Sequence, residues 1–457
     1  MALGDSSFPR ALLLIMKKGR ILLFNPWIYD FTAFDFWMKP LGLLYLGAHL
    51  RRKGFEVSLV DCLDRNDPDM PFSPAGSRRL REYGCGGYFR EPIPKPAAFA
   101  GIPRCFSRFG IPIKTLTKRL LALPPPDLVA ISVGMTYWYP GAVTALRLLR
   151  QIWPRATVVL GGVYPALCPE HANSWGFDQI VTATNPVVVF RELSKILGVD
   201  LGVNNNQQYF SCPPDFSLYS RISYAVILTS LGCPFRCTYC ASSRLYPHFW
   251  FREAEQVLEE IEYLYQAFQI KDFAFYDDAW LFQASSRVIP LLEKIIARGL
   301  KVRFHLPNGL HARYLTPQLA VLMKQSGFTT IRLSLETTSL SVQRKTGKKV
   351  DNSVFEQAVT YLKRAGFSSS QIEVYLLFGL PGLQKEDYFQ SIRWVKEKGL
   401  IPRMALFSPI PGTPVFHESS LEVPEIETDP LFQNKIAFNY LRGYDKLYQE
   451  VQSFCRY

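Results

Sequence analysis

The stretch that decides the fold is Leu231-Gly232-Cys233-Pro234-Phe235-Arg236-Cys237-Thr238-Tyr239-Cys240, in which three cysteines follow a C-x3-C-x2-C spacing. The apolar, β-branched run at 224–228 predicts a buried strand just before it. Gly232 and Pro234 predict a loop at the carboxyl end of that strand. Active sites lie at this end in barrels of alternating strands and helices. The three cysteines are therefore predicted to form a site on a loop.

The chemistry of these cysteines differs from that of the others in the chain. Three thiolates on a short loop suit an iron–sulfur cluster, which normally takes four cysteines and would here keep one iron open. Structural zinc is the alternative, but it needs a fourth Cys or His, and His248 lies outside the usual spacing. The other cysteines stand alone and are interpreted as buried small apolar residues; they are Cys62, Cys85, Cys105, Cys168, Cys212 and Cys455.

Downstream of the loop, helical and extended patterns alternate. Each predicted helix has a period near 3.6, and each predicted strand is short and apolar. Six strand–helix alternations are typical of parallel βαβ units. The strands are predicted at 272–276, 302–306, 330–336, 372–378 and 404–407, and the helices at 253–268, 286–298, 317–326, 353–364 and 385–398.

The cysteine spacing, with an aromatic residue (Tyr239) before the last cysteine, resembles the signature of the radical S-adenosylmethionine (SAM) superfamily. The alternation resembles the partial (β/α)6 barrel of that superfamily, here assigned to residues 206–415. The resemblance implies that Cys233, Cys237 and Cys240 ligate a [4Fe–4S] cluster whose open iron is chelated by SAM. One electron from the reduced cluster then cleaves SAM to a 5′-deoxyadenosyl radical.

The resemblance also implies which strand ends contact SAM. Asp277 and Asp278 stand where the family often has a Gly-Gly-Glu turn that holds the methionine amino group. The alternative is that both aspartates cap the next segment, and that Gly379 serves only a tight turn. The complete set expected to bind SAM is Tyr239, Asp277, Asp278, Ser334, Glu336, Gly379 and Pro381.

The N-terminal part shows a second alternating pattern. Strands are predicted at 21–24, 56–61, 128–134 and 156–160, with helices at 39–50 and 142–151. The order predicts a doubly wound, Rossmann-like sheet, which binds ligands beyond the carboxyl ends of its strands. Gly161 and Gly162 allow a close backbone approach there, but the G-x-G-x-x-G fingerprint of dinucleotide sites is absent.

This pattern resembles the cobalamin-binding domain that precedes many radical SAM barrels, and residues 1–205 are assigned to it. The loop at 25–38 contains no histidine, so the resemblance implies no lower histidine ligand from a D-x-H-x-x-G motif. The alternative is a scaffold that has lost cobalamin, because 181–186 replaces the usual Gly-Glu-rich turn. The residues expected to bind cobalamin are Pro40, Leu41, Gly42, Ser132, Gly134, Gly161, Gly162 and Val163.

Two further segments complete the predicted organisation. Residues 66–126 are an insertion between strands, rich in Pro, Gly and Arg, and their length predicts a lid or a docking surface. Residues 416–457 are predicted to form a short helical tail.

The composition of the chain indicates its expected cellular compartment and its expected binding partners. The chain has 457 residues with 48% apolar and 20% charged side chains and a net charge of +13, which is typical of a folded protein with a solvated basic surface rather than a nucleic-acid site. The apolar run at 11–16 is too short for a membrane span, and Lys17 and Lys18 follow it, unlike in a signal peptide. A cytoplasmic enzyme with an external electron donor, such as flavodoxin or ferredoxin, is expected.

The predicted function is cobalamin-dependent methyl transfer to an unactivated carbon by a radical SAM enzyme. One alternative is a radical cyclase, oxidase or rearrangement enzyme in which cobalamin has another role or is lost. The other is a non-catalytic iron–sulfur protein. A methylthiotransferase would need its own cysteine triplet in the N-terminal domain.

Overall fold

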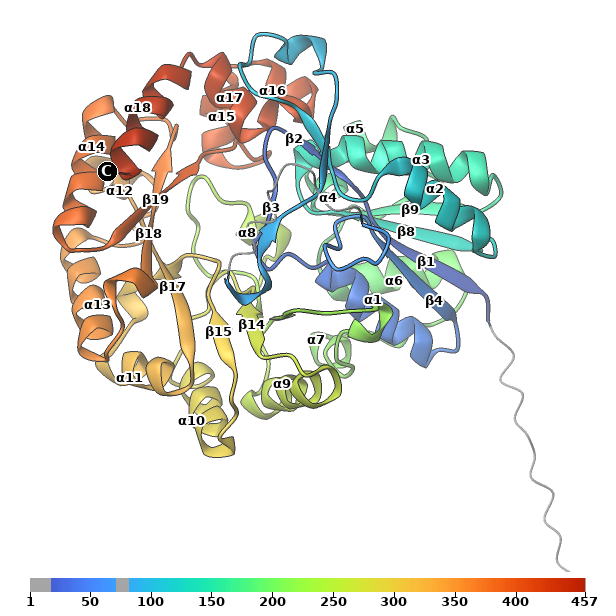
Figure 1. The fold of residues 1–457 in the computed structure, drawn as a ribbon, viewed down its shortest axis with the longest axis horizontal. Coiled ribbons are helices and arrows are strands. Elements are labelled where there is room, and N and C mark those ends of the chain that lie inside the picture. The colour runs from blue at the N-terminus through green and yellow to red at the C-terminus, as the bar shows by residue number, and fades with distance from the viewer. Residues whose placement is uncertain (1–17, 71–81, 457) are drawn as a thin grey trace, which may run out of the picture.

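The computed structural model describes residues 18–70 and 82–456 (Figure 1). The apolar run at 11–16 lies outside them. A doubly wound sheet and an open barrel lie side by side in Figure 1, and the first half of the chain forms the sheet. In the described part of the chain, no helix is long and apolar enough to cross a membrane.

The N-terminal sheet is five-stranded and parallel within the described residues, with the order β10-β9-β8-β1-β4. The chain runs from β1 to β4 on one side and then crosses to β8 on the other. The topological switch point therefore lies between β1 and β8, where doubly wound sheets bind ligands. The strands are β1 (Arg20–Asn25), β4 (Glu56–Asp61), β8 (Leu128–Val133), β9 (Thr157–Gly162) and β10 (Gln179–Ile180).

Helices cover both faces of this sheet because alternate strand residues are apolar on both sides. Leu23 of β1 belongs to the core that includes α1 (Leu41–Arg52) and α6 (Pro186–Leu197). Its neighbour Phe24 belongs to the opposite core, with α3 (Tyr139–Ile152) and α2 (Ile113–Ala122). The predicted Rossmann-like architecture is confirmed.

The second sheet is parallel and follows the path β11-β14-β15-β17-β18-β19, with β16 paired to β17. Between the described residues of β11 and β19 there is no pairing, so the barrel is open. Its strands are β11 (Ala225–Ile227), β14 (Asp272–Phe275), β15 (Arg303–His305), β16 (Leu310–His311), β17 (Phe328–Glu336), β18 (Ile372–Phe378) and β19 (Ile401–Leu406).

The helices between these strands lie on the outside of the barrel (Figure 1). Their bounds are α9 (Ala254–Phe268), α10 (Val288–Arg298), α11 (Pro317–Gln325), α13 (Asn352–Arg364) and α14 (Lys385–Glu397). Several predicted strand bounds differ from the structure by one or two residues, and the start of the last strand differs by three. The last strand was predicted from residue 404 but begins at Ile401 and so includes Pro402. A proline is tolerated here because β19 is an edge strand, so the missing N–H removes no hydrogen bond to a neighbouring strand.

The insertion packs against other parts of the chain. Its strands β6 (Arg90–Pro92) and β7 (Ser107–Phe109) form an antiparallel sheet with β2 (Ile28–Asp30). Phe99 and Phe106 share a small core with Ile436 of helix α17 (Lys435–Leu441), and the Tyr440 hydroxyl donates to the Gly101 carbonyl at 2.6 Å. The insertion thus docks onto the C-terminal tail.

A buried ion pair of the barrel half accepts a hydrogen bond from the N-terminal half. Glu260 of α9 pairs with Arg252 at 2.8 Å, and both side chains are 2% exposed. The hydroxyl of Tyr45, which lies on α1 of the N-terminal sheet, donates to Glu260 at 3.2 Å. The predicted division near residue 205 falls just before α7 (Asn206–Tyr209), and the division into domains stays a prediction.

Replacing Tyr45 by Phe should destabilise the folded protein. A hydrogen bond to a charged group contributes about 1.5–3 kcal/mol, and its loss leaves the buried Glu260 with one donor fewer. The midpoint of thermal unfolding should therefore fall. Tyr88→Phe is the control, since the buried Tyr88 hydroxyl has no partner among the described residues, and its midpoint should stay level or rise. Equal midpoints for the two variants would contradict this account of the junction.

Candidate active site

The cysteine loop follows β11 and the short strand β12 (Ser230–Leu231), which pairs with β13 (Trp250–Phe251). Gly232 begins the loop with φ of 79°. A Cβ atom at this position would lie 2.9 Å from the His248 carbonyl oxygen, so only glycine fits here. The loop therefore starts at a turn that the sequence specifies.

Three neighbouring segments hold the loop. The Thr238 amide donates to the Thr346 carbonyl at 3.4 Å, and the Thr238 carbonyl accepts from the Val415 amide at 3.1 Å. The Phe235 ring stacks on His311 with 4.3 Å between centroids. These contacts come from the segments that follow β16, β17 and β19, so the barrel mouth itself positions the cysteines.

The three thiols are free, with Cys233 and Cys237 half-buried and Cys240 exposed. Desolvation in the loop raises the pKa of Cys233 to about 12 and of Cys240 to about 11. Such thiols become thiolates only when a metal stabilises them. Among the described residues, no three His, Cys, Asp or Glu side chains gather closely enough to hold a single ion. Three cysteine ligands on one loop suit a cluster that keeps one iron open, whereas structural zinc needs a fourth Cys or His.

A partly buried ion pair lies beside the cysteines. Glu336, at the end of β17, has a left-handed backbone (φ 67°) next to an irregularity in the β17–β18 register, and its carboxylate accepts from Lys349 Nζ at 3.1 Å. Burial opposes the charge on Lys349, but Glu336 and then Cys237 outweigh it and raise its pKa. Tyr239 lies near the same carboxylate and the Cys237 thiol. Lys349 was not predicted as a site residue, because nothing in the sequence separates it from Lys348.

The two adjacent aspartates after β14 have different surroundings. The carboxylate of Asp277 is fully buried and accepts from Thr229 Oγ1 at 2.5 Å and from Arg287 Nη2 at 3.0 Å, and also from Ser230. Asp278 is exposed, accepts from the Ser242 hydroxyl, and lies close enough to Cys233 to raise the pKa of that thiol. Of the two, Asp278 is the one that faces the thiols.

The remaining residues predicted for SAM lie on β17 and in the turn that follows β18. Ser334 is buried, and its hydroxyl faces Gly309, where an added Cβ would lie only 1.9 Å away. Gly379 faces the C-terminal tail: a Cβ there would lie 1.8 Å from Asn439, and its carbonyl accepts from Arg442. Pro381, two residues on, is buried. The turn at Gly379 is therefore shaped by the tail, and its predicted contact with adenine stays a prediction.

A cleft of about 300 Å³ lies at the carboxyl edge of the N-terminal sheet. Its walls come from the start of α1, from β8 and β9, and from α6. Every residue predicted for cobalamin lines it, namely Pro40, Leu41, Gly42, Ser132, Gly134, Gly161, Gly162 and Val163. The structure therefore brings together residues that are more than 120 positions apart in the sequence, as Gly42 and Val163 show.

The glycines of this cleft test whether it leaves room for a ligand. A Cβ atom on Gly42 would have nothing within 4 Å, and one on Gly134 or Gly161 would make only an ordinary contact at 3.8 or 3.9 Å. None of these three needs a left-handed backbone. Packing within the protein therefore does not require glycine at these three positions. A large planar ligand lying against them would require glycine, because any side chain would occupy its space. Gly162 differs, since its φ is 98° and a Cβ would lie 2.6 Å from the Val133 carbonyl oxygen.

The cleft shares a wall with the cysteine loop. Leu228 and Leu231, which flank the start of that loop, line the cleft together with Tyr246 from the segment that follows it. Thr184, in the stretch where a Gly-Glu-rich turn was expected, also lines it and donates to the Leu245 carbonyl at 2.7 Å. The predicted cobalamin cleft thus extends to residues that lie just before and just after the cysteine loop in the sequence.

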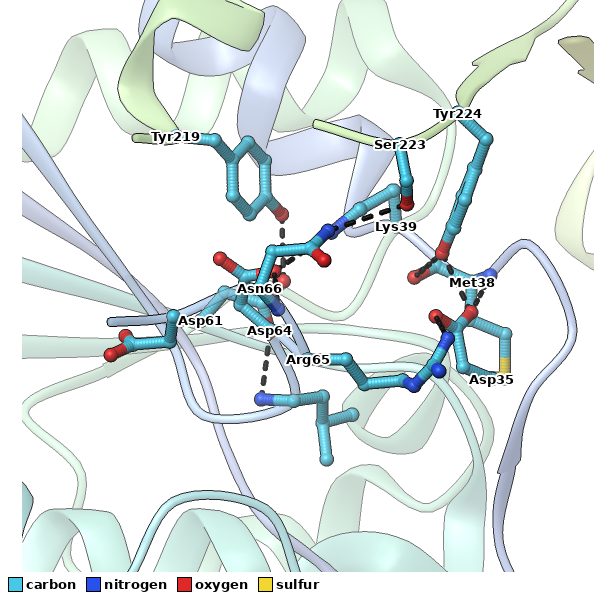
Figure 2. Close-up of polar contacts among 12 residues, drawn as sticks. Asp35, Met38, Lys39, Asp61, Asp64, Arg65, Asn66, Tyr219, Ser223 and Tyr224 are labelled. Atoms are coloured by element: carbon cyan, nitrogen blue, oxygen red, sulfur yellow. Dashed lines mark hydrogen bonds and ion pairs between the residues drawn. The ribbon is translucent and has the colours of Figure 1, made fainter. Parts of the chain in front are cut away.

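Next to this cleft, a buried polar network holds the sheet against the barrel (Figure 2). Asp35 and Asp61, from the loop after β1 and the end of β4, accept from the hydroxyls of Tyr224 and Tyr219, each at 2.6 Å. Lys39 Nζ lies 3.4 Å from Asp64 and 4.1 Å from the centre of the Tyr219 ring. Burial raises the pKa of Asp35 and Asp64, and the Lys39 ammonium opposes this rise.

Comparison with known proteins agrees with this geometry. Residues 227–395, from β11 to within α14, match the profile of the Radical SAM superfamily. The chain therefore contains a radical SAM domain. It is an enzyme, and a [4Fe–4S] cluster and SAM are the cofactors that such a domain implies.

Curated relatives are similar over most of the chain. An uncharacterized methyltransferase of Pyrococcus horikoshii is 24% identical over 322 residues, which cover 63% of this chain and 68% of the relative. The bacteriochlorophyllide d C-12(1)-methyltransferase of Chlorobaculum tepidum is 23% identical over 290 residues, covering 60% of this chain and 62% of that enzyme.

A solved structure shares the fold over both halves of the chain. The radical SAM methyltransferase TsrM from Kitasatospora setae, with cobalamin and a [4Fe–4S] cluster bound, superposes with a TM-score of 0.65 at 18% identity. The match covers 89% of this chain and 78% of that one. The similarity confirms the predicted order of a doubly wound domain followed by a radical SAM barrel.

Replacing Asp277 should destabilise the fold, whereas replacing Asp278 should not. Asp277→Ala leaves Arg287 buried without its carboxylate, and breaking such a pair costs about 3–5 kcal/mol. The thermal unfolding midpoint of Asp277→Ala should fall strongly. Asp278→Ala should unfold like the wild type but bind SAM more weakly in equilibrium dialysis. The opposite pattern would show that Asp277 is the ligand-facing carboxylate.

Proposed function

We propose that this protein is a cobalamin-dependent radical SAM enzyme that transfers a methyl group to an unactivated carbon. The observation that carries the proposal is that Leu228, Leu231 and Tyr246, which flank the cysteine loop in the sequence, also line the glycine-containing cleft. The fold shared with a cobalamin-bound methyltransferase and the names of the two curated relatives support it.

The cluster with bound SAM would supply the 5′-deoxyadenosyl radical, and cobalamin the methyl group. Cys233, Cys237 and Cys240 would hold the cluster at the barrel mouth. Lys349 carries a cation suited to the carboxylate of the methionine moiety, and Asp278 a carboxylate suited to its ammonium group. Glu336 would orient Lys349 through their 3.1 Å contact.

The chain's own residues also give the cleft its selectivity. Gly42, Gly134 and Gly161 leave a flat, open wall for the corrin ring. The deeper lining is apolar, with Leu43, Leu46, Phe190, Leu193 and Tyr209, and would accept the apolar part of the nucleotide tail. Apolar walls also exclude water, which protects a reactive radical from side reactions.

Product analysis tests the function. Reconstituted under anaerobic conditions with iron, sulfide, hydroxocobalamin and dithionite, the protein should convert SAM to 5′-deoxyadenosine and methionine. Cys237→Ala should lose the iron and the absorbance near 400 nm because it lacks a ligand, whereas Cys105→Ala, at an exposed cysteine outside the loop, should keep both. Absence of 5′-deoxyadenosine with a full cluster would refute the radical SAM activity. SAM cleavage without methylation of any substrate would favour a cyclisation or oxidation instead.

A substitution series at Gly161 tests the cobalamin site. Gly161→Ala adds one methyl group with an ordinary contact and should weaken retention of the corrinoid slightly. Gly161→Leu should fill the wall and abolish the corrinoid absorbance spectrum, while iron content and the thermal unfolding midpoint of the apoprotein stay at wild-type values. If Gly161→Leu retains the corrinoid, the assignment of this cleft is wrong.

A further inference from the structure

Exposed basic residues surround the cysteine loop. Arg236 lies in the loop itself, Arg313 in η5 (Ala312–Tyr314), and Arg344 in α12 (Leu340–Lys345), with Lys348 four residues further on. All four side chains are exposed, and together they are called the basic rim. They come from three separate segments of the barrel.

Backbone contacts fix the basic rim to the loop. A Cβ on Gly347 would lie 3.3 Å from Cys237 Cα and 3.4 Å from the Arg236 carbonyl oxygen, so the segment that carries Lys348 touches the loop. The Arg313 guanidinium donates to the Lys348 carbonyl. The basic rim therefore borders the cluster ligands, and Cys240 is exposed to solvent beside them.

The charge of the basic rim is not neutralised locally. No carboxylate of the described residues forms an ion pair with any of its four members, and the adjacent Lys345, which pairs with Glu418 at 2.9 Å, is not counted among them. Asp351 lies near Lys348 and Arg313 without forming an ion pair with either. Left-handed backbone at Gly347 (φ 105°) and Lys348 (φ 50°) turns Lys349 inward to Glu336 and leaves Lys348 outside.

We infer that the basic rim is the docking surface for an acidic one-electron carrier of the flavodoxin or ferredoxin class. The inference rests on the proposed function, since each reductive cleavage of SAM consumes one electron, which the carrier loses and the cluster gains. Complementary charge steers two proteins into contact and raises the rate of association. A positive ring around the point of electron entry fits a carrier whose own redox group is surrounded by carboxylates.

Charge reversal on the basic rim tests the inference. Arg344→Glu/Lys348→Glu is compared with Lys114→Glu/Lys118→Glu, which makes the same change in net charge on exposed residues of α2. Figure 1 shows α12 and α2 on opposite sides of the molecule. The probe is a purified flavodoxin. Its Kd for each reconstituted protein is measured by calorimetry at low ionic strength, and the rate at which its hydroquinone bleaches the cluster is measured by stopped flow.

The rim variant should bind flavodoxin at least about tenfold more weakly than the wild type and accept electrons from it correspondingly more slowly. The α2 variant should match the wild type in both measurements. Dithionite is a small reductant that needs no docking surface, so it should bleach the cluster of all three proteins to the same final extent. Equal Kd values for the two variants would overturn the inference. Failure of dithionite to support SAM cleavage in the wild type would instead refute the proposed function, because the Kd comparison does not depend on catalysis.

Discussion

The arrangement of both sites depends on the buried hydrogen bonds from Tyr224 and Tyr219 to Asp35 and Asp61. These carboxylates follow strands of the N-terminal sheet, and the tyrosines precede the first barrel strand. A buried carboxylate without donors is costly, so the sheet and the barrel cannot move apart without leaving polar groups unpaired. The network thereby fixes the carboxyl edge of the sheet against the start of the cysteine loop.

From that constraint follows the closeness of the cleft to the cysteine loop. Leu228 and Leu231 lie within a few residues of both Tyr224 and Cys233, so the chain that anchors the barrel also forms the wall of the cleft. Because these shared residues are mostly apolar, they help to exclude water where the cleft meets the loop. Glu336 and Lys349 form a partly buried ion pair near the cysteine loop. The basic rim lies beside the same loop and is the surface on which we infer that the electron carrier docks.

Much of the architecture could be predicted because it depends on local patterns. Short apolar runs identified the strands of both halves, period-3.6 apolar spacing identified the helices, and the glycine and cysteine spacing identified the loop. The residues that line the cleft were named from the resemblance to cobalamin-binding domains, and the parallel strands that end at one edge of the sheet bring Gly134 and Gly161 together there. Short strands such as β10 and β16 carry too few residues for a pattern and were missed.

Tertiary context decided what adjacent, similar residues do. Asp277 and Asp278 are indistinguishable in the sequence. In the structure, Asp277 forms an ion pair with the buried Arg287, whereas Asp278 lies near the Cys233 thiol. Lys348 and Lys349 differ only because the backbone turns left-handed between α12 and α13. The role of Gly379 in packing against the tail depends on Asn439, 60 positions away, which no local pattern reveals.

The most direct test of the central claim, that two cofactor sites share one wall, is electron paramagnetic resonance of the protein loaded with both a reduced [4Fe–4S] cluster and cob(II)alamin. The spins should broaden and split each other's signals through dipolar coupling, and Gly161→Leu, which blocks the cleft, should restore the isolated cluster signal. Superimposed signals without any coupling, in protein that holds both groups in full, would contradict the account.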